Sequence, residues 1–211
     1  MDLPLIDRLR GLLYDLLHNV DTRSPASIDN LDIVGNNKRF GMPYRVTMPK
    51  SLRTVLKGLP EFSPDTAFID MGSGKGCTLL VASRFPFRKI IGVEFATELC
   101  QIAQKNIYSY RGSQACKDIS VLQMDATEFP FPDSPLLIYF FNPFHAPIME
   151  KVLHNLAQSL ASTPRPVTLV CDAFYHKDTI MRIFRPQQTG RICGFSIYTS
   201  HAGVPLQESN G

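Results

Sequence analysis

Several features that would place this chain in a familiar class are missing from its sequence. No apolar run approaches the roughly 18 residues that a membrane-spanning helix needs, so we expect no membrane span. The five cysteines are odd in number and form no C-x-x-C pair, which argues against a disulfide framework and a cysteine zinc site. Reduced thiols of this kind are typical of a cytoplasmic protein. The net charge of +3 is too small to indicate a nucleic-acid-binding protein.

Motifs of several enzyme classes are absent as well. The histidines show no H-E-x-x-H spacing, so we predict no catalytic metal. No G-x-S-x-G elbow is present to suggest a hydrolase. The N-terminus carries acids where a signal peptide would carry positive charge.

From Asp65 onward, short apolar segments alternate with helical patterns in a chain of 211 residues. Continuous apolar strands bracketed by helices predict an α/β fold with a parallel sheet covered on both faces. The predicted strands are 67–71, 89–94, 119–123, 136–141, 167–172 and 192–200. The predicted helices are 76–84, one with Thr97 as its N-cap, one beginning near Pro147, and 177–184.

Residues 1–60 are predicted to form a helical N-terminal cap on a domain at 61–205, followed by a tail at 206–211. Leucines at helical spacing from Leu5 to Leu16 predict an amphipathic helix. Its polar face is not rich in lysine and arginine, so we expect it to pack onto the domain rather than to lie on a membrane. Residues 33–60 contain no acid, which is typical of a solvated face or of a basic rim for an acidic substrate. The basic residues there are Lys38, Arg39, Arg45, Lys50, Arg53 and Lys57.

The segment 68–76, Phe-Ile-Asp-Met-Gly-Ser-Gly-Lys-Gly, follows a predicted strand and opens a predicted helix. Glycines lack a Cβ atom and so let the backbone turn sharply and approach a ligand closely. A Walker A loop would need glycine where Ile69 stands and Ser or Thr where Gly76 stands. The dinucleotide fingerprint would place its third glycine at Cys77 rather than at Gly76.

An acid, Asp70, stands two residues before the first glycine of this segment. The arrangement resembles the first motif of the class I S-adenosyl-L-methionine (SAM)-dependent methyltransferases, D/E-x-G-x-G-x-G, and the resemblance covers residues 65–172. It implies a Rossmann-like, doubly wound, mostly parallel sheet of seven strands. SAM carries a cationic amino-acid group in place of a pyrophosphate, so an acid near its ammonium is favourable. The resemblance implies a cofactor held by Asp70, Gly72, Ser73, Gly74 and Gly76.

Further residues stand where the adenosine part of a cofactor would bind. Glu94 ends the second predicted strand, where a carboxylate can accept both ribose hydroxyls, a device that NAD enzymes share. Phe95 beside it is a candidate to pack on the adenine. By the same resemblance, Asp125, followed by Ala126 after the third strand, accepts from the adenine amino group.

The acceptor site is predicted after the fourth strand, because ligands of open α/β sheets bind outside the carboxyl ends of the strands. Asn142-Pro143-Phe144 is similar to the N/D-P-P-Y/F element of amino-group methyltransferases, with one proline missing. In that family the polar side chain accepts hydrogens from the target nitrogen, and the aromatic ring favours positive charge. The glycine motif also looks like that of protein-lysine methyltransferases lacking a SET domain, with Tyr44 and Pro49 loosely filling their upstream positions.

The sequence therefore predicts an enzyme that transfers a methyl group from SAM to an unidentified acceptor, with a nitrogen atom favoured and protein lysine as one candidate. Asn142, Pro143 and Phe144 are the predicted catalytic residues. The acceptor could be a protein, a nucleic acid or a small molecule. The alternatives are an NAD(P)-dependent oxidoreductase with a variant glycine turn and a non-catalytic SAM-binding protein.

Overall fold

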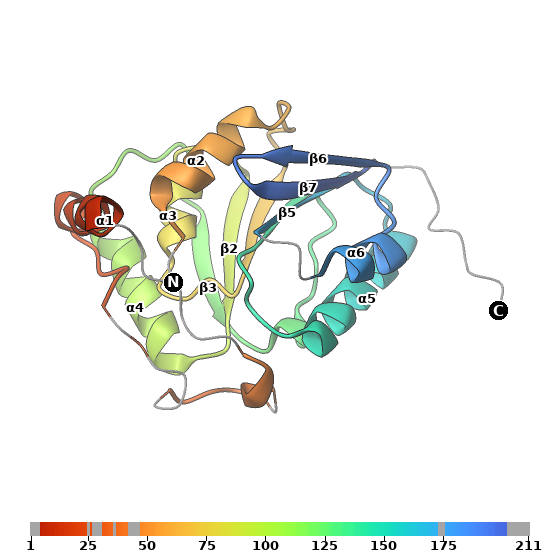
Figure 1. The fold of residues 1–211 in the computed structure, drawn as a ribbon, viewed down its shortest axis with the longest axis horizontal. Coiled ribbons are helices and arrows are strands. Elements are labelled where there is room, and N and C mark those ends of the chain that lie inside the picture. The colour runs from red at the N-terminus through yellow and green to blue at the C-terminus, as the bar shows by residue number, and fades with distance from the viewer. Residues whose placement is uncertain are drawn as a thin grey trace.

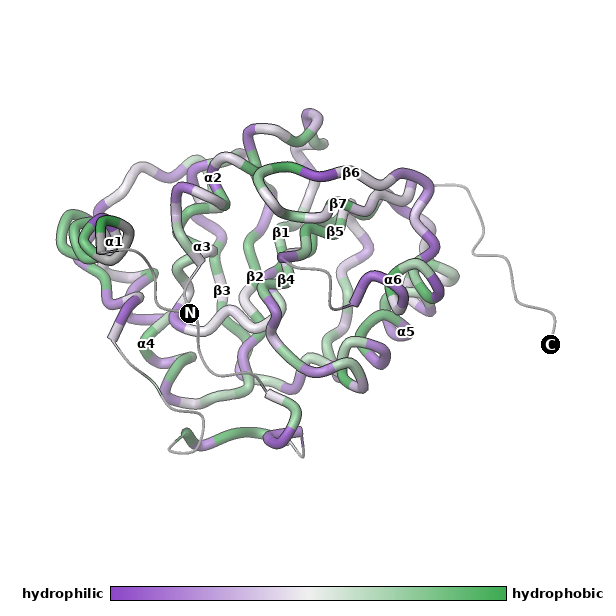
Figure 2. Tube along the Cα trace, viewed as in Figure 1, coloured by the Kyte–Doolittle hydropathy of each residue, from purple (hydrophilic) through white to green (hydrophobic). Residues whose placement is uncertain are grey.

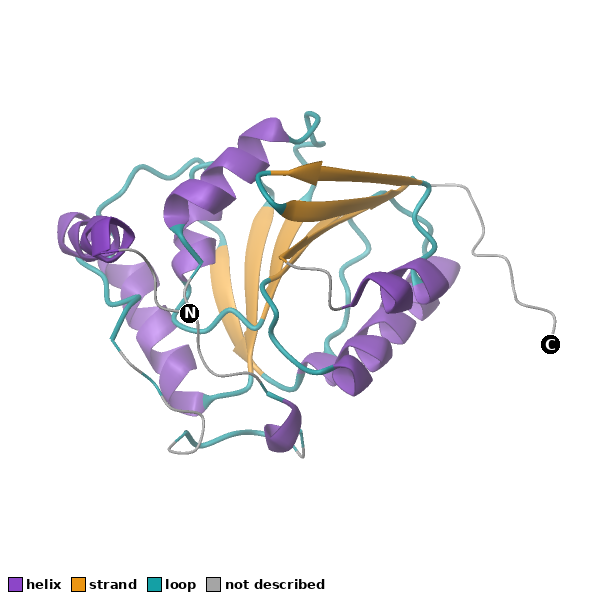
Figure 3. Cartoon of the chain, in the orientation of Figure 1, coloured by secondary structure: helices purple, strands orange, loops and turns teal. Residues whose placement is uncertain are grey.

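The computed structural model describes residues 5–24, 26, 31–35, 37–41, 47–172 and 176–201. In these ranges a central sheet carries helices on both faces (Figure 1 and Figure 3). Within the same ranges, no helix is both long and apolar enough to cross a bilayer, and no three metal-ligating side chains gather into a site. Tyr44 and the tail predicted at 206–211 lie outside the described residues.

Seven strands form the sheet in the order β3-β2-β1-β4-β5-β7-β6. The strands β1 to β5 run parallel, whereas β7 is antiparallel to both β5 and β6. The predicted Rossmann-like, mostly parallel sheet is therefore confirmed. The strands are β1 (Ala67–Met71), β2 (Lys89–Glu94), β3 (Ile119–Gln123), β4 (Leu136–Phe140), β5 (Val167–Asp172), β6 (Gln188–Ile192) and β7 (Phe195–Ser200).

The helices form two layers around this sheet. One face is covered by α2, α3 and α4, and the other by α5 and α6 (Figure 1). The first helix, α1, lies at the edge of the molecule beside α2 and α4 (Figure 1). The helices are α1 (Leu5–His18), α2 (Pro49–Gly58), α3 (Cys77–Ala82), α4 (Thr97–Ser109), α5 (Ala146–Ser162) and α6 (Lys177–Ile183), with 3-10 turns η2 (Lys38–Phe40) and η3 (Ala126–Glu128).

Two hydrophobic cores fix the position of the strands, because successive side chains of a strand point to opposite faces. Phe68 packs with Leu52 of α2 and Leu79 of α3, whereas the next residue, Ile69, packs with Val152 of α5. β1 and β4 are buried at every position, as expected in the middle of a sheet. Burial of each such large side chain stabilises the fold by about 1.5–3 kcal/mol. The carboxyl ends of β1 and β4 are thus held rigidly side by side.

Two predicted boundaries are wrong. The single strand expected at 192–200 is the second half of a hairpin, whose turn lies at Cys193 and Gly194 with φ values of 49° and 85°. Positive φ at both central residues gives the turn a twist that matches the strands, but cysteine is not a residue that signals such a turn. Thr97 is the first residue of α4 rather than its N-cap.

The leucines of α1 are not packed onto the domain as predicted. The helix contacts the domain through buried Gly11 and through Tyr14, which packs against the core. Leu9, Leu13 and Leu16 remain 57%, 54% and 79% exposed. Because these leucines lie on the opposite side of the helix from Gly11 and Tyr14, the contacts that hold α1 leave them in solvent.

Candidate functional site

A pocket opens at the carboxyl edge of the sheet, where β1 lies between β2 and β4. The helices after β1 and β2 cover one face of the sheet and the helix after β4 covers the other, so the connections diverge and leave a crevice. The pocket brings together nine of the twelve predicted site residues: Gly72, Gly74, Glu94, Phe95, Asp125, Ala126, Asn142, Pro143 and Phe144.

The glycine turn that follows β1 reaches this pocket without side chains. Gly72, Gly74 and Gly76 have φ values of 91°, 51° and 78°, in the region that glycine adopts readily. A Cβ atom on Gly72 would lie only 2.5 Å from Cβ of Pro143. The turn after β1 and the loop after β4 therefore touch at a point where no side chain fits.

Glu94 holds the glycine turn from the end of β2. Its buried carboxylate accepts from the amide of Gly74 at 2.8 Å, and its other oxygen accepts from the amides of Phe95 and Ala96, each at 3.0 Å. Burial raises the pKa of Glu94, while these hydrogen bonds act in the opposite direction. The oxygen that accepts from Gly74 keeps one lone pair, whereas the other oxygen already accepts two hydrogen bonds. The predicted contact with both ribose hydroxyls stays a prediction.

Asp125 ties the end of β3 to a segment far upstream. One of its oxygens accepts from the amide of Thr127 at 2.9 Å and caps η3. The other accepts from the side-chain amide of Asn37 at 2.6 Å. A Cβ atom on Gly35 would approach that oxygen to 2.9 Å. The predicted adenine contact of Asp125 stays a prediction, and the structure adds a role in fixing the upstream segment.

We call this segment, residues 31–41 without position 36, the N-terminal strap. It crosses the pocket and pairs at both ends: Ile33 forms a β-bridge with Ala96 after β2, and Gly41 forms one with Phe144 after β4. Figure 1 shows it, with η2, beneath the lower edge of the sheet. The strap therefore lies over the ends of β2 and β4 and covers the crevice between them.

The strap supplies pocket residues that the sequence analysis did not identify. The absence of acids from residues 33–60 indicates the charge of this region but not its position. Hydrogen bonds such as the one from Asn37 to Asp125, 88 residues away, set the position instead. The strap residues that line the pocket are Leu31, Asn37, Phe40 and Gly41.

The loop after β4 places an amide and an aromatic ring on the opposite wall. Asn142 has a φ of 48°, a left-handed conformation that asparagine tolerates better than most residues. Phe144 is buried and meets Phe140 edge to face, with ring centroids 6.3 Å apart. His145, the next residue, is exposed and does not line the pocket.

Three predicted cofactor residues lie behind the pocket lining. Asp70 is 2% exposed and accepts from the hydroxyl of Thr78 in α3. Ser73 has a buried hydroxyl without a hydrogen-bond partner among the described residues. Gly76 is the N-cap of α3. Their predicted contact with a cofactor stays a prediction. In this structure these three residues belong to β1 and the glycine turn but do not line the pocket.

Lys75, inside the glycine turn, joins the turn to the N-terminal region. Its side chain is 1% exposed, and its ammonium donates to the carbonyl of Ser24 at 2.8 Å and lies 3.4 Å from the carboxylate of Asp21. Asn106 of α4 donates to the carbonyl oxygens of both Asp21 and Lys75. Residues 21–24, the turn and α4 thus form one hydrogen-bonded unit.

Replacing Asp70 by asparagine is expected to stabilise the protein increasingly between pH 5 and pH 8. Burial, with added repulsion from Glu94, raises the pKa of Asp70 from 3.8 to about 7, against the hydrogen bond from Thr78. The folded state therefore binds this proton more tightly than the unfolded chain does. The protonated carboxyl of Asp70 therefore contributes its full stability to the folded state below the pKa of the unfolded chain. This contribution is lost as pH rises through about 7. In urea unfolding at pH 8, the free energy of unfolding of Asp70→Asn should exceed that of the unsubstituted protein by up to about 4 kcal/mol.

A matched control separates this effect from a general loss of negative charge. Asp118 carries an exposed carboxylate, so Asp118→Asn should change the urea midpoint little and equally at both ends of the pH range. A stability difference for Asp70→Asn that does not change with pH would contradict the raised pKa.

Comparison with known protein families and structures agrees with this arrangement. Residues 68–163 match the family model described as a methyltransferase domain. The match runs from β1 through α5 and so includes the glycine turn, Glu94, Asp125 and the Asn142–Phe144 loop. No curated protein matches the chain.

Several solved structures share the fold. An RNA methyltransferase from Salinibacter ruber, in complex with S-adenosyl-L-homocysteine, aligns with a TM-score of 0.53 and 18% identity over 80% of this chain and 99% of its own. A putative RNA methyltransferase from Pyrococcus horikoshii aligns with a TM-score of 0.52 and 15% identity, over 85% of this chain and 94% of its own. A predicted N6-adenine-specific DNA methylase from Listeria monocytogenes aligns with a TM-score of 0.57 and 11% identity. This alignment covers 75% of this chain but only 52% of that protein.

Proposed function

Because this chain is a class I SAM-dependent methyltransferase, we propose that it methylates a nitrogen atom of its acceptor in the pocket described above. The observation that carries this proposal is the contact between the glycine turn and the Asn142-Pro143-Phe144 loop. A cofactor site and an acceptor site that border one pocket can place a methyl group and a nucleophile in line.

The described residues fit SAM better than a dinucleotide. Gly72 and Gly74 leave backbone open to the pocket, and Ser73 beneath them has a buried hydroxyl without a partner. Glu94 and Asp125 present carboxylates to the pocket, which suit hydroxyl and amino groups and would repel a diphosphate. Among the described lining residues there is no lysine or arginine to offset phosphate charge. We therefore assign these residues to the cofactor, with Glu94 on the ribose and Asp125 on the adenine.

SAM supplies a methyl group on a sulfonium centre, which is strongly electrophilic, so the protein has mainly to align the nucleophile and exclude water. In our proposal the side-chain oxygen of Asn142 accepts a hydrogen from the acceptor nitrogen and so turns its lone pair toward the methyl group. The ring of Phe144 covers the site and favours the positive charge that develops on nitrogen. Leu31 and Phe40 of the strap exclude water from the opposite side.

Transfer of labelled methyl groups from SAM to fractionated lysate tests this proposal. Nucleic acids are the first fractions to examine, because RNA and DNA methyltransferases are among the proteins of similar fold. We expect label on a nitrogen atom of one fraction. Binding of S-adenosyl-L-homocysteine without transfer to any fraction would instead indicate a non-catalytic SAM-binding protein, and an O-methyl product would refute the nitrogen assignment.

Replacing Asn142 by glycine should lower methyl transfer by about 100-fold while cofactor affinity is retained. Glycine keeps the left-handed backbone without strain and removes only the side chain, so the fold should be unaffected. Calorimetry with S-adenosyl-L-homocysteine and the transfer assay measure the two quantities separately.

Asn19→Gly is the matched control, because Asn19 has a similar φ of 56° but lies at the end of α1, outside the pocket. It should leave both quantities unchanged. Equal activity of Asn142→Gly and the unsubstituted protein would show that this amide does not assist transfer.

A further inference from the structure

The N-terminal strap brings one polar side chain, Asn37, to the lining of the pocket. The other described strap residues in the lining, Leu31, Phe40 and Gly41, offer apolar atoms or backbone. Figure 2 shows both the hydrophilic and the hydrophobic colour along this segment. Asn37 is also the N-cap of η2, and its carbonyl accepts from the amide of Phe40 at 2.9 Å. The side chain of Asn37 therefore projects from a fixed backbone position.

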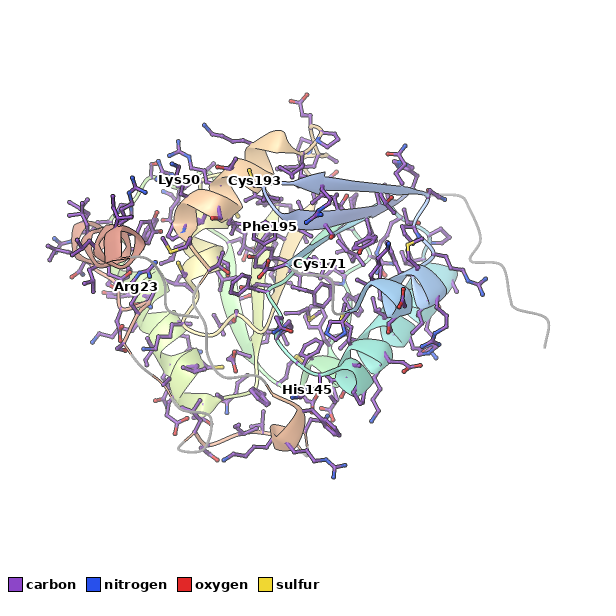
Figure 4. The ribbon with its side chains drawn as sticks, in the orientation of Figure 1. Arg23, Lys50, His145, Cys171, Cys193 and Phe195 are labelled. Carbon is purple, nitrogen blue, oxygen red and sulfur yellow. The ribbon has the colours of Figure 1, made fainter. Side chains whose placement is uncertain are left out.

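Backbone contacts on both sides of Asn37 hold the strap in place. Before it, the amide of Val34 donates to the carbonyl of Phe95 at 3.0 Å. After it, the carbonyl of Phe40 accepts from the amide of His145 at 2.9 Å. His145, labelled in Figure 4, is the N-cap of α5 and lies beside η2. The strap is thus tied to the ends of β2 and β4, and between these ties Asn37 meets the loop after β3.

The carboxylate of Asp125 in that loop has few hydrogen-bond positions left. Its two oxygens together can accept about four hydrogen bonds. Oδ1 accepts from both the amide and the hydroxyl of Thr127, at 2.9 Å and 2.8 Å. Oδ2 accepts from Nδ2 of Asn37 at 2.6 Å. With these donors from the described residues in place, one lone pair of Oδ2 stays available at the pocket that Asp125 lines.

The strap also sets the direction from which that lone pair can be reached. The amide of Asn37 must turn its nitrogen to Asp125, because its oxygen would otherwise face a carboxylate oxygen. Gly35 lies against the same Oδ2, since a Cβ atom added there would come within 2.9 Å of it. The strap therefore occupies one side of Oδ2, and the pocket side is left to a donor of the ligand.

We propose that Asn37 is a positioning residue that holds Asp125 so that the pocket accepts a 6-aminopurine and rejects a 6-oxopurine. The inference rests on the proposed function, in which Asp125 binds the adenine of the cofactor. An adenine amino group donates one hydrogen to the remaining lone pair. The oxygen of a 6-oxopurine would face the carboxylate instead, and two acceptors repel each other.

The role of Asn37 in this discrimination follows from what a less restrained carboxylate would do. A 6-oxopurine carries an N1–H donor next to its oxygen. A carboxylate that can turn would avoid the oxygen and accept from this N1–H. Asn37 and Thr127 hold the two oxygens of Asp125 from different sides and so prevent this adjustment. Selectivity for the base then depends on a residue of the strap as well as on Asp125.

Calorimetry with S-adenosyl-L-homocysteine and its deaminated analogue S-inosyl-L-homocysteine tests the proposal on the full chain. The unsubstituted protein should bind the adenosyl compound at least about 100-fold more tightly. Asn37→Ala should weaken binding of the adenosyl compound about 10-fold and reduce this ratio about 10-fold. A strap that merely detached would weaken both compounds and leave the ratio unchanged. Lys38→Gln, at an exposed position of the same turn outside the lining, is the matched control and should preserve the ratio.

Asn37→Asp gives a second readout. At pH 8 two carboxylates would face each other, so affinity for S-adenosyl-L-homocysteine should fall at least about 100-fold. As pH falls toward 6, a proton shared by the pair replaces the lost donor, and the deficit relative to the unsubstituted protein should shrink about 10-fold or more. The other ionisable groups on the elements around Asp125 are Glu94, Lys38 and Glu128, and they are the same in both proteins.

The outcomes separate this inference from the proposed function. A binding ratio that Asn37→Ala leaves unchanged, or a deficit of Asn37→Asp that does not vary with pH, overturns the inference alone. Equal affinity of the unsubstituted protein for the two compounds overturns it as well. If the unsubstituted protein binds no S-adenosyl-L-homocysteine, the cofactor assignment fails and the inference fails with it.

Discussion

Alanine in place of Gly72 should lower the affinity for SAM by at least about 100-fold. The new Cβ atom would lie 2.5 Å from Cβ of Pro143, and the φ of 91° is one that alanine rarely adopts. The backbone strain alone disfavours the native turn by about 1–2 kcal/mol. The overlap must then be relieved by moving either the glycine turn or the loop after β4. Both border the pocket, so either displacement moves groups that we assign to the cofactor away from their binding positions.

Two other glycines of the chain separate strain from overlap. Gly194 has a φ of 85°, but a Cβ atom added there would meet no other atom within 4 Å, and Gly190 has neither positive φ nor such a neighbour. Gly194→Ala should therefore destabilise the protein without changing the affinity for S-adenosyl-L-homocysteine in calorimetric titration. Gly190→Ala should change neither the stability nor this affinity. If Gly72→Ala bound the cofactor as tightly as Gly194→Ala, the contact with Pro143 would not matter for the site.

The parallel half of the fold was predictable because its signals are local. Residues 67–71 and 167–172 are short apolar runs with β-branched residues, and the structure has strands at the same positions. The hairpin of β6 and β7 was missed because Gln188–Ile192 is largely exposed and polar, as an edge strand is, and its turn uses Cys193. Where burial on both faces sets the pattern, the sequence reveals the strand.

Half of the pocket lining was predictable for a related reason. Gly72, Glu94 and Asn142 each follow directly on a predicted strand or end one, and the carboxyl ends of parallel strands share one edge. The strap could not be placed in this way. Its position depends on long-range hydrogen bonds, such as the one that Asn37 donates to Asp125, and nothing in the local pattern specifies them.

The direction of a buried side chain was also beyond the sequence. Asp70 lies in the predicted motif, yet its carboxylate turns toward Thr78 in α3 rather than into the pocket. Residues of β1 alternate between the two faces, and Asp70 shares the face of Phe68, which α3 covers. A motif identifies the turn, but the register of the strand decides which of its side chains border the pocket.

Replacing Glu94 by glutamine should lower cofactor affinity by about 10- to 100-fold and destabilise the fold by about 1–3 kcal/mol. The carboxylate accepts from three backbone amides, two on one oxygen and one on the other. A side-chain amide has a single oxygen, so its NH₂ group must face an N–H donor. If the oxygen keeps Phe95 and Ala96, the amide of Gly74 loses its acceptor at the pocket wall. Chemical denaturation and calorimetry with S-adenosyl-L-homocysteine measure the two losses.

The same substitution has a second effect that loss of structure alone would not produce. Repulsion from Glu94 helps to raise the pKa of Asp70 to about 7, so removing that charge should lower the pKa of Asp70. The pH at which stability is lost should then move down, as carboxyl resonances in NMR or urea titrations across pH would show. Glu61→Gln, at an exposed position before β1, should leave both affinity and this pH unchanged. An unaltered pH profile in Glu94→Gln would mean that the two carboxylates do not interact, and that Glu94 serves the turn only through its hydrogen bonds.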